Sequence, residues 1–396
     1  MSYGDGAIYL DHAATTPVDP AVVELMLPWF TREFGNPSSI YQRGQAAHAA
    51  LDRARKQIAG ILRCAPSEVI FTSGATESNG TALKGVAWAA RLRYPDGPAP
   101  HIITSAIEHH AVLHAADSLE RQGFAVTRIG CDRDGVVSPQ AVADAIRPET
   151  CLISIMYANN EIGTFQPIAE IGALAREHGI PFHTDAVQAA GVLSLDVQAL
   201  NVDMLSLSAH KFYGPKGVGV LYLRKQVPME FQQVGGGQES GRRGGTENVP
   251  LIVGMAEALV RADTARDQYN AWCRQLRDSL WTQIEERIPA VTLNGPPLDG
   301  PRLPNNLNIT IDGVQGETVL LSLDMGGVAA SAGSACTTGN TEPSHVLLAC
   351  GLSEAAARSS MRLTVGRGNS MDEIDEAVDI LVETVERVRM LAGVTV

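Results

Sequence analysis

The chain has 396 residues, more than one compact domain usually needs, so a large domain with a smaller one is expected. Its 45% apolar and 19% charged residues are typical of a globular protein and argue against extensive disorder. The net charge of −13 argues against nucleic acid and anionic membranes as partners, because both require a positive surface. No apolar window is long enough to span a bilayer, and the N-terminal residues do not resemble a secretory leader, so we expect a cytoplasmic protein.

Short apolar runs alternate with helical patterns from about residue 60 to residue 225. This alternation favours a mostly parallel sheet with helices packed against it. The expected strands cover 68–73, 101–105, 150–156, 180–185, 203–208 and 217–223, and the expected helices cover 78–93, 110–122, 139–146 and 168–178.

After Pro250 the pattern becomes that of a smaller α+β domain. It begins with one long helix over 251–288, and further strands are expected at 306–311, 328–331 and 361–365, with helices at 316–323, 343–350 and 371–391. We therefore predict a large domain of residues 18–260. The small domain would combine residues 1–17 with 261–396 and would carry a cysteine-bearing loop at 331–342.

Polar groups follow several of the expected strands, and ligands bind at the carboxyl ends of strands in an open parallel sheet. The stretch 72–78 turns through Gly74 into a helix, where backbone N–H groups and the hydroxyl of Thr76 could hold a phosphate. Asp185 ends another strand, with Gln188 one turn later. Each group could instead be an ordinary structural cap.

Lys211 lies at the end of a buried apolar strand, just after Ser208 and His210. Its amine has no obvious route to solvent, and a partly desolvated amine can react with a carbonyl. A phosphate cradle, a carboxylate and a lysine are together what pyridoxal phosphate requires of a protein. The sequence therefore predicts this cofactor, with Lys211 as the residue that binds its aldehyde.

Imidazole and amide groups follow two other strands. His109 and His110 could stack on the cofactor ring, and Asn160 could lie beside it. His110 and His114 are four residues apart and could instead hold zinc, although no third ligand of suitable spacing follows.

Six cysteines occur without a Cys-x-x-Cys pair, so reduced thiols are expected. Most of them are expected to be inert packing residues. Cys336 differs because it lies in a run of small polar residues, 331–340, where a thiol has little to pack against. This setting predicts an accessible nucleophile.

Almost the whole chain resembles the cysteine desulfurases of the NifS/IscS type, in the class V aminotransferase group of fold-type I pyridoxal-phosphate enzymes. The resemblance rests on ordered motifs at 9–17, 34–38, 71–78, 108–109, 159–163, 210–211, 244–246, 333–336 and 342–345. It implies a mostly parallel seven-stranded sheet with helices on both faces and a smaller α+β domain. Ala209, Gly245 and Ala332 depart from residues that are frequent at these positions, but none of them removes a catalytic group.

The resemblance also implies a role for each site residue. Lys211 would bind the cofactor aldehyde, His109 would stack on the ring and move protons, and Asp185 would pair with the pyridinium. Arg362 would bind the substrate carboxylate. The remaining contacts would come from Gln188 at the phenolate oxygen, from Asn160 near both cofactor and substrate, and from Ala75, Thr76, Ser208, His210 and Thr246 at the phosphate, with Thr246 supplied by the other subunit of a homodimer.

The implied reaction removes sulfur from L-cysteine, giving L-alanine and a persulfide on Cys336 that passes to acceptor proteins such as an iron–sulfur scaffold. No resident metal is implied, although Cys336 could transiently ligate an iron–sulfur cluster. The alternatives are a selenocysteine lyase, an aminotransferase of the same fold, or a non-catalytic docking subunit of an iron–sulfur assembly complex. One sequence does not identify the acceptor.

Overall fold

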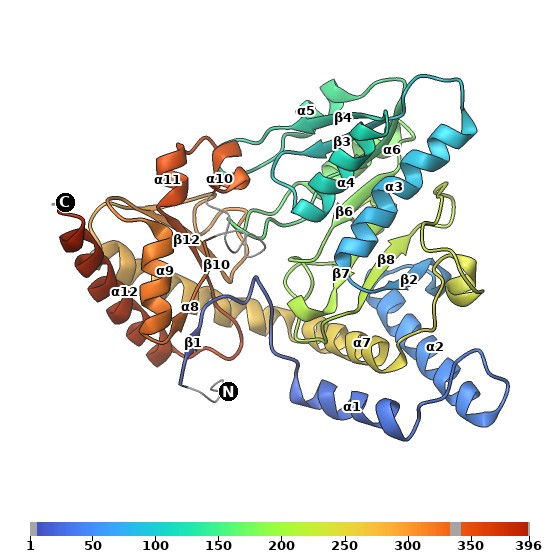
Figure 1. Ribbon diagram of the computed structural model, residues 1–396, viewed down its shortest axis with the longest axis horizontal. Coiled ribbons are helices and arrows are strands. Elements are labelled where there is room, and N and C mark those ends of the chain that lie inside the picture. The colour runs from blue at the N-terminus through green and yellow to red at the C-terminus, as the bar shows by residue number, and fades with distance from the viewer. Residues whose placement is uncertain (1–5, 333–341, 395–396) are drawn as a thin grey trace.

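A computed structural model describes residues 6–332 and 342–394 (Figure 1). Its main sheet has seven strands in the order β2-β8-β7-β6-β5-β3-β4, and only β8 runs antiparallel to its neighbours. The predicted mostly parallel sheet is therefore confirmed. The strands are β2 (Val69–Thr72), β3 (His101–Ser105), β4 (Ala125–Ile129), β5 (Thr150–Ser154), β6 (Phe182–Asp185), β7 (Met204–Ser208) and β8 (Gly219–Leu223).

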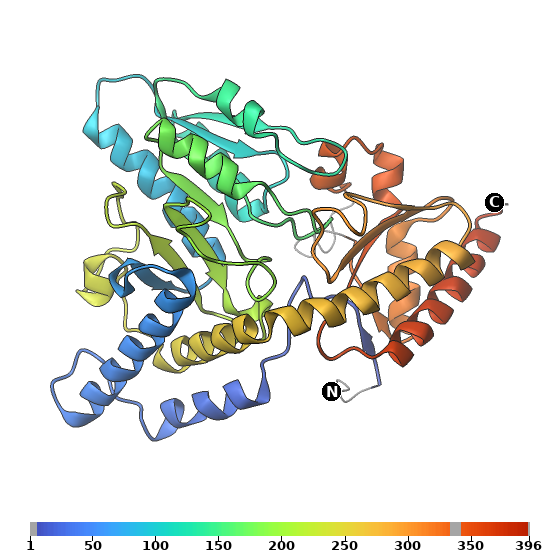
Figure 2. The same ribbon diagram turned by 180° about the vertical axis from the view of Figure 1, so that it is seen from behind.

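Helices cover both faces of this sheet, because successive side chains of each strand point to opposite sides. Ile102 of β3 packs into a core under α3 (Ala75–Arg93) and α4 (His110–Arg121). The next residue, Ile103, belongs to the core on the opposite face. That face is covered by α2 (Gln42–Leu62), α5 (Pro139–Ala145), α6 (Ile168–Glu177) and α7 (Val249–Thr264), several of which lie in front in Figure 2.

The strand β4 was not expected from the sequence. It lies at the edge of the sheet and pairs only with β3. Its first four side chains are half-buried or exposed, so it lacks the continuous apolar run by which the buried strands are recognised.

A second core supports the smaller α+β part of the molecule. Its three-stranded antiparallel sheet places β10 (Asn306–Ile311) between β9 (Val291–Leu293) and β12 (Ser360–Thr364), and a parallel pair joins β1 (Ile8–Tyr9) to β11 (Val328–Ala329). Three helices pack around it: α8 (Arg266–Arg287), α9 (Gly316–Met325) and α12 (Met371–Leu391).

The prediction of a single helix over 251–288 is wrong. The structure has two helices, α7 and α8, with Ala265 between them. Ala265 has φ −91° and ψ 2°, which leaves the α-helical range and allows the two helices to follow different cores. The side chains of α7 pack in the first core, whereas those of α8 pack in the second (Figure 2).

Two short helices, α10 (His345–Ala349) and α11 (Glu354–Arg358), follow Cys336, which lies outside the described residues. Val346, Leu347 and Cys350 pack into the first core, beside the main sheet.

The domain boundaries at residues 18 and 261 remain a prediction. The first helix of the chain, α1 (Pro20–Thr31), lies beside α7. None of the described helices combines the length and the apolar content that crossing a membrane requires.

Candidate active site

A cavity of about 510 Å³ opens where β2, β3, β5, β6 and β7 end. Parallel strands bring their carboxyl ends to one edge of the sheet, which is why residues from five separate segments meet there. Thr246 does not line the cavity and is exposed. The predicted site residues that do line it are Ala75, Thr76, His109, Asn160, Asp185, Gln188, Ser208, His210, Lys211 and Arg362.

One end of the cavity is formed by the start of α3. Gly74 precedes this helix, and within the described chain no side chain caps its first turn. The turn packs closely on β8, since a Cβ on Gly219 would lie 2.7 Å from the Cα of Gly74. Ser208 and His210 line the same cavity. Uncapped N–H groups at the start of a long helix, with hydroxyl and imidazole groups nearby, fit a phosphate.

Asp185 is held in place at the end of β6. Its Oδ2 accepts a 2.6 Å hydrogen bond from Nδ2 of Asn79, and its Oδ1 accepts a 3.0 Å hydrogen bond from the backbone N–H of Val187. Both partners fix the direction of the carboxylate, which fits a group that must face a pyridinium nitrogen. Sequence reasoning missed Asn79. The only sequence signal for Asn79 as a site residue was its position one helical turn after Ala75.

His109 is the N-cap of α4. Its Nδ1 accepts a 3.1 Å hydrogen bond from the N–H of Ala111, so the neutral ring carries its proton on Nε2. Burial lowers the pKa of His109, and the nearby carboxylate of Asp185 only partly offsets this effect. His109 is therefore a neutral ring at neutral pH and could both stack on a planar ligand and exchange protons.

The residue before it, Glu108, is fully buried under the site. Its Oε1 accepts hydrogen bonds of 2.6 Å from Oγ of Ser105 and 2.8 Å from the N–H of Met156, while among the described residues its Oε2 has no partner. Burial raises the pKa of Glu108 to about 8. Glu108 therefore holds a proton at neutral pH.

We expect Glu108 to make the protein less stable as the pH rises. Its pKa is raised on folding, so its contribution to stability is complete below the usual carboxyl pKa and is lost as the pH passes about 8. Glu108→Gln cannot ionise and keeps an acceptor for Ser105. In denaturant titrations between about pH 5 and 9, it should therefore retain a few kcal/mol of unfolding free energy that the wild type loses, at about 1.4 kcal/mol per pKa unit. Glu24→Gln serves as the control, because Glu24 is exposed. Parallel curves of unfolding free energy against pH for Glu108→Gln and the wild type would contradict the prediction.

The N-terminal segment 10–16 crosses the site and contacts its central residues. Nζ of Lys211 donates to the carbonyl oxygens of Ala13 at 2.5 Å and Ala14 at 2.8 Å, and Nε2 of Gln188 donates to the Ala13 oxygen at 3.0 Å. Nδ1 of His210 lies 3.1 Å from the Thr15 hydroxyl. The motif 9–17 contributed to the resemblance in the sequence, but its contacts with the lysine could not be read from it.

Arg362 reaches the cavity from β12. Its Nη2 lies 2.7 Å from Oδ1 of Asp11, and its Nη1 donates to the Asn160 carbonyl at 2.8 Å. The Arg362 side chain is only 1% exposed and that of Asp11 16%, so this is a largely buried pair and not a surface ion pair. Its buried Nε has no partner among the described residues. A buried guanidinium with a spare donor fits a ligand carboxylate.

We expect Asp11 to position Arg362 for substrate. Asp11→Asn replaces a charge-assisted hydrogen bond by a neutral one, which costs about 1 kcal/mol. It should raise the KM for L-cysteine, the substrate that the family resemblance implies, about 5-fold to 10-fold with a smaller change in kcat. The control ligand is cysteamine, which lacks the carboxylate. Its binding, followed by absorbance, should be nearly unchanged in the variant. An equal loss for both compounds would mean that Asp11 acts only on the fold.

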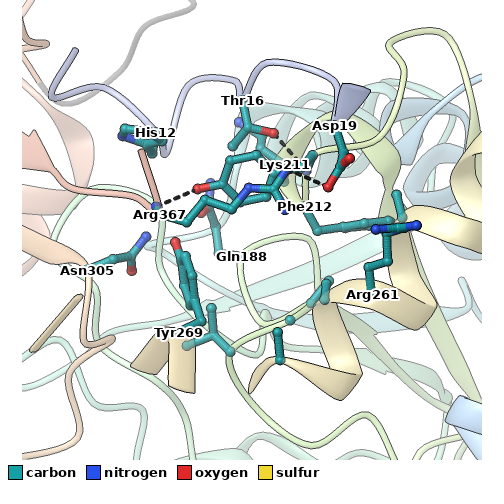
Figure 3. A pocket seen from close by; sticks show the side chains of 17 residues that line it. His12, Thr16, Asp19, Gln188, Lys211, Phe212, Arg261, Tyr269, Asn305 and Arg367 are labelled. Carbon is teal, nitrogen blue, oxygen red and sulfur yellow. Dashed lines mark hydrogen bonds and ion pairs between the residues drawn. The ribbon is translucent and has the colours of Figure 1, made fainter. Parts of the chain in front are cut away.

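A second, smaller pocket of about 50 Å³ lies next to the cavity (Figure 3). Lys211 and Gln188 line both spaces. On the far wall, the guanidinium of Arg367 lies 2.9 Å from Oδ2 of Asp19 and stacks 3.8 Å from the ring centre of Tyr213. Lys211 therefore lies between the two spaces and is in contact with both.

Three histidines lie close together next to the site. The rings of His110 and His114 are stacked with centroids 5.1 Å apart, and His345 lies 4.8 Å from His110. Within residues 6–332 and 342–394, no three histidine, cysteine, aspartate or glutamate side chains are grouped so that they could hold a metal ion. The structure thus gives no support to a zinc pair at His110 and His114.

Comparison with known proteins relates this geometry to a family. A family model described as aminotransferase class-V matches residues 8–377. A curated relative from Methanosarcina thermophila, named cysteine desulfurase IscS, is 49% identical over 395 residues, which cover 100% of this chain and 96% of the relative. The chain belongs to the cysteine desulfurases of the class V aminotransferase family. Enzymes of this family use pyridoxal phosphate.

Solved structures agree with this assignment. A NifS-like protein superimposes with a TM-score of 0.89 at 35% identity and covers 96% of this chain and 100% of its own. A second structure, described as SspA in complex with cysteine, has a TM-score of 0.79 at 41% identity, with 91% and 99% of the two chains covered. The structure therefore has the fold of NifS-like proteins, as the sequence predicted.

Proposed function

We propose that this cysteine desulfurase binds pyridoxal phosphate in the 510 Å³ cavity and uses it to convert L-cysteine to L-alanine. The proposal is carried by one observation, the convergence of Lys211, Asp185, His109 and Arg362 on that cavity. The names of the relatives support the same chemistry, and one related structure is described as a complex with cysteine.

The residues of the cavity fit the parts of this cofactor. The start of α3, with Thr76, Ser208 and His210, would hold its phosphate, Asp185 its pyridine nitrogen, and Lys211 its aldehyde. When bound, pyridoxal phosphate withdraws electrons from the α-carbon of an amino acid attached to it.

Three groups of the chain would then act on L-cysteine. Arg362, fixed by Asp11, would bind the α-carboxylate and orient the substrate. Lys211 and neutral His109 would move the protons that leave and return to the substrate carbons. The Cys336 thiolate would attack the substrate sulfur, so that a sulfur–sulfur bond forms, the carbon–sulfur bond breaks, and the carbon fragment gains a proton to become alanine.

Product analysis tests this function. With L-cysteine and a dithiol reductant, the purified holoenzyme should release alanine and sulfide in equal amounts. An aminotransferase would instead form a keto acid and require an amino acceptor, and a selenocysteine lyase would turn over L-selenocysteine but hardly L-cysteine. A non-catalytic docking subunit would give no turnover. Any of these three results would overturn the proposal.

We also propose that the protein is a homodimer. Apolar side chains on and after α1 are unusually exposed, including Leu27 at 57%, Phe30 at 55% and Phe34 at 64%. Clusters of this kind mark association surfaces. A second copy on this face is consistent with the exposed position of Thr246, which the family resemblance assigns to the partner's phosphate site.

Light scattering on the eluting protein tests the dimer. We expect a mass of two chains for the wild type and a shift towards the monomer for Phe30→Glu, because a buried unpaired carboxylate opposes association. The matched control is Leu92→Glu, since Leu92 at the end of α3 is 59% exposed and lies outside the proposed interface. A dimer that withstands Phe30→Glu but not Leu92→Glu would place the interface elsewhere.

The sulfur bound to Cys336 would pass to acceptor proteins in the cytoplasm, such as an iron–sulfur scaffold. The net charge of −13 supports protein acceptors over nucleic acid. Co-purification with the persulfide form of the enzyme, compared with its reduced form, would identify the acceptor.

A further inference from the structure

Two thiols from distant parts of the chain meet outside the active-site cavity. Cys131 follows β4 at the edge of the main sheet, and Cys350 ends α10. Their Sγ atoms are 3.9 Å apart, and both are free cysteines. The S–H of Cys131 also points to the carbonyl oxygen of Ala349 at 3.6 Å. Neither thiol lines the cavity, so the proposed desulfurase reaction does not use them.

The two thiols differ in exposure and in acidity. Cys131 is half-buried, whereas Cys350 is 3% exposed. The hydrogen bond from the Cys350 S–H lowers the pKa of Cys131, and the same hydrogen bond, together with burial, raises the pKa of Cys350. An accessible thiol that ionises more readily, next to a buried protonated one, suits a reaction in which the first attacks a disulfide and the second resolves the product.

We propose that Cys131 and Cys350 form a reversible disulfide by exchange with a low-molecular-weight disulfide such as glutathione disulfide. The Cys131 thiolate attacks one sulfur of the oxidant, forms a mixed disulfide and releases one glutathione thiolate. Cys350 then loses its proton and attacks Sγ of Cys131, which forms the Cys131–Cys350 bond and releases the second thiolate. Two cysteine thiols are oxidised, and one disulfide is reduced to two thiols.

The surroundings allow the two sulfurs to approach each other. They must close by about 2 Å to reach the S–S bond length of about 2.05 Å. Cys350 is buried in the first core, whereas Cys131 is only partly buried against that core and is followed by an exposed turn at 132–134. An exposed turn moves at lower cost than a packed helix, so the movement falls on the side of Cys131.

The disulfide would tie α10 covalently to the edge of the main sheet. This helix is already docked beside the active site, where His345 Nε2 lies 2.9 Å from the carbonyl oxygen of Glu108, and Ser344 Oγ donates to Oε2 of Glu161 at 2.5 Å. Glu108 directly precedes His109, and α10 follows Cys336 in the sequence. The proposed disulfide would therefore anchor a helix that follows Cys336 in the sequence and contacts the residue before His109.

Peptide mapping of oxidised holoenzyme tests the pair. A Cys336→Ser background removes the thiol assigned to catalysis. After treatment with glutathione disulfide and alkylation, we expect one cross-linked peptide that contains Cys131 and Cys350 and disappears with dithiothreitol. Cys64 is the matched control, because it is also half-buried but burial raises its pKa to about 12, so it should stay a thiol. Absence of the cross-link, or equal modification of Cys64, would overturn the proposal.

Single variants test the order of attack in the same background. Cys350→Ser should accumulate glutathione on Cys131, because the resolving thiol is missing, and Cys131→Ser should leave Cys350 unmodified. Oxidation should raise the melting temperature only when both cysteines are present. Glutathione on Cys350 in the Cys131→Ser variant, or a lower melting temperature after oxidation, would contradict the assignment of a native cross-link with Cys131 as the attacking thiol.

Discussion

Lys211→Ala is expected to abolish turnover of L-cysteine, with a loss of at least about 10²-fold to 10⁴-fold, the range for a positioned proton-transferring group. Lys211 lies where β7 ends and faces the cavity, and its amine is held by the carbonyl oxygens of Ala13 and Ala14. Treatment with borohydride should couple the cofactor to the Lys211 peptide in the wild type and leave the variant unlabelled.

Two other lysines make this experiment decisive. Lys216 also lines the cavity, so label on a Lys216 peptide would overturn the assignment of Lys211. Lys225 is exposed after β8 and does not line the cavity, so Lys225→Ala should retain wild-type turnover and labelling. A loss of turnover in Lys225→Ala would indicate that the activity responds to a general change of charge and not to one amine.

Cys336→Ser is expected to separate binding from sulfur removal. The variant keeps Arg362 and Lys211, so adding L-cysteine should still change the absorbance of the bound cofactor. A serine hydroxyl does not ionise near neutral pH and cannot accept sulfur, so alanine and sulfide should fall to background, a loss of at least about 10²-fold. Cys64→Ser is the control, because Cys64 does not line the cavity.

The result for Cys336→Ser also bears on the reaction class. Full sulfide production by the variant would show that another group takes the sulfur. A variant that forms a keto acid when an amino acceptor is supplied would behave as an aminotransferase, because that reaction needs the cofactor and the lysine but no thiol. Desulfuration predicts that the variant loses both alanine and sulfide but keeps the absorbance change on addition of L-cysteine.

Most of the central residues of the site could be predicted from the sequence, and the reason is the sheet. Strands buried on both faces are continuous apolar runs, so their ends are visible, and parallel strands bring those ends to one edge. Asp185 is the last residue of β6, and Lys211 and His109 follow closely after β7 and β3. The edge strand β4 and the two-residue strand β1 carry no such run, and the sequence did not reveal them.

Most strands of the main sheet, their parallel arrangement and the residues at the sheet edge could be predicted from the sequence alone, because these depend on the periodicity of burial along each segment. Which distant groups touch could be seen only in the folded structure. Asp11 meets Arg362 across 351 residues, Asn79 meets Asp185 across 106, and Cys131 meets Cys350 across 219. Contacts of this kind depend on how whole elements pack against one another, and no local pattern of residues records that packing.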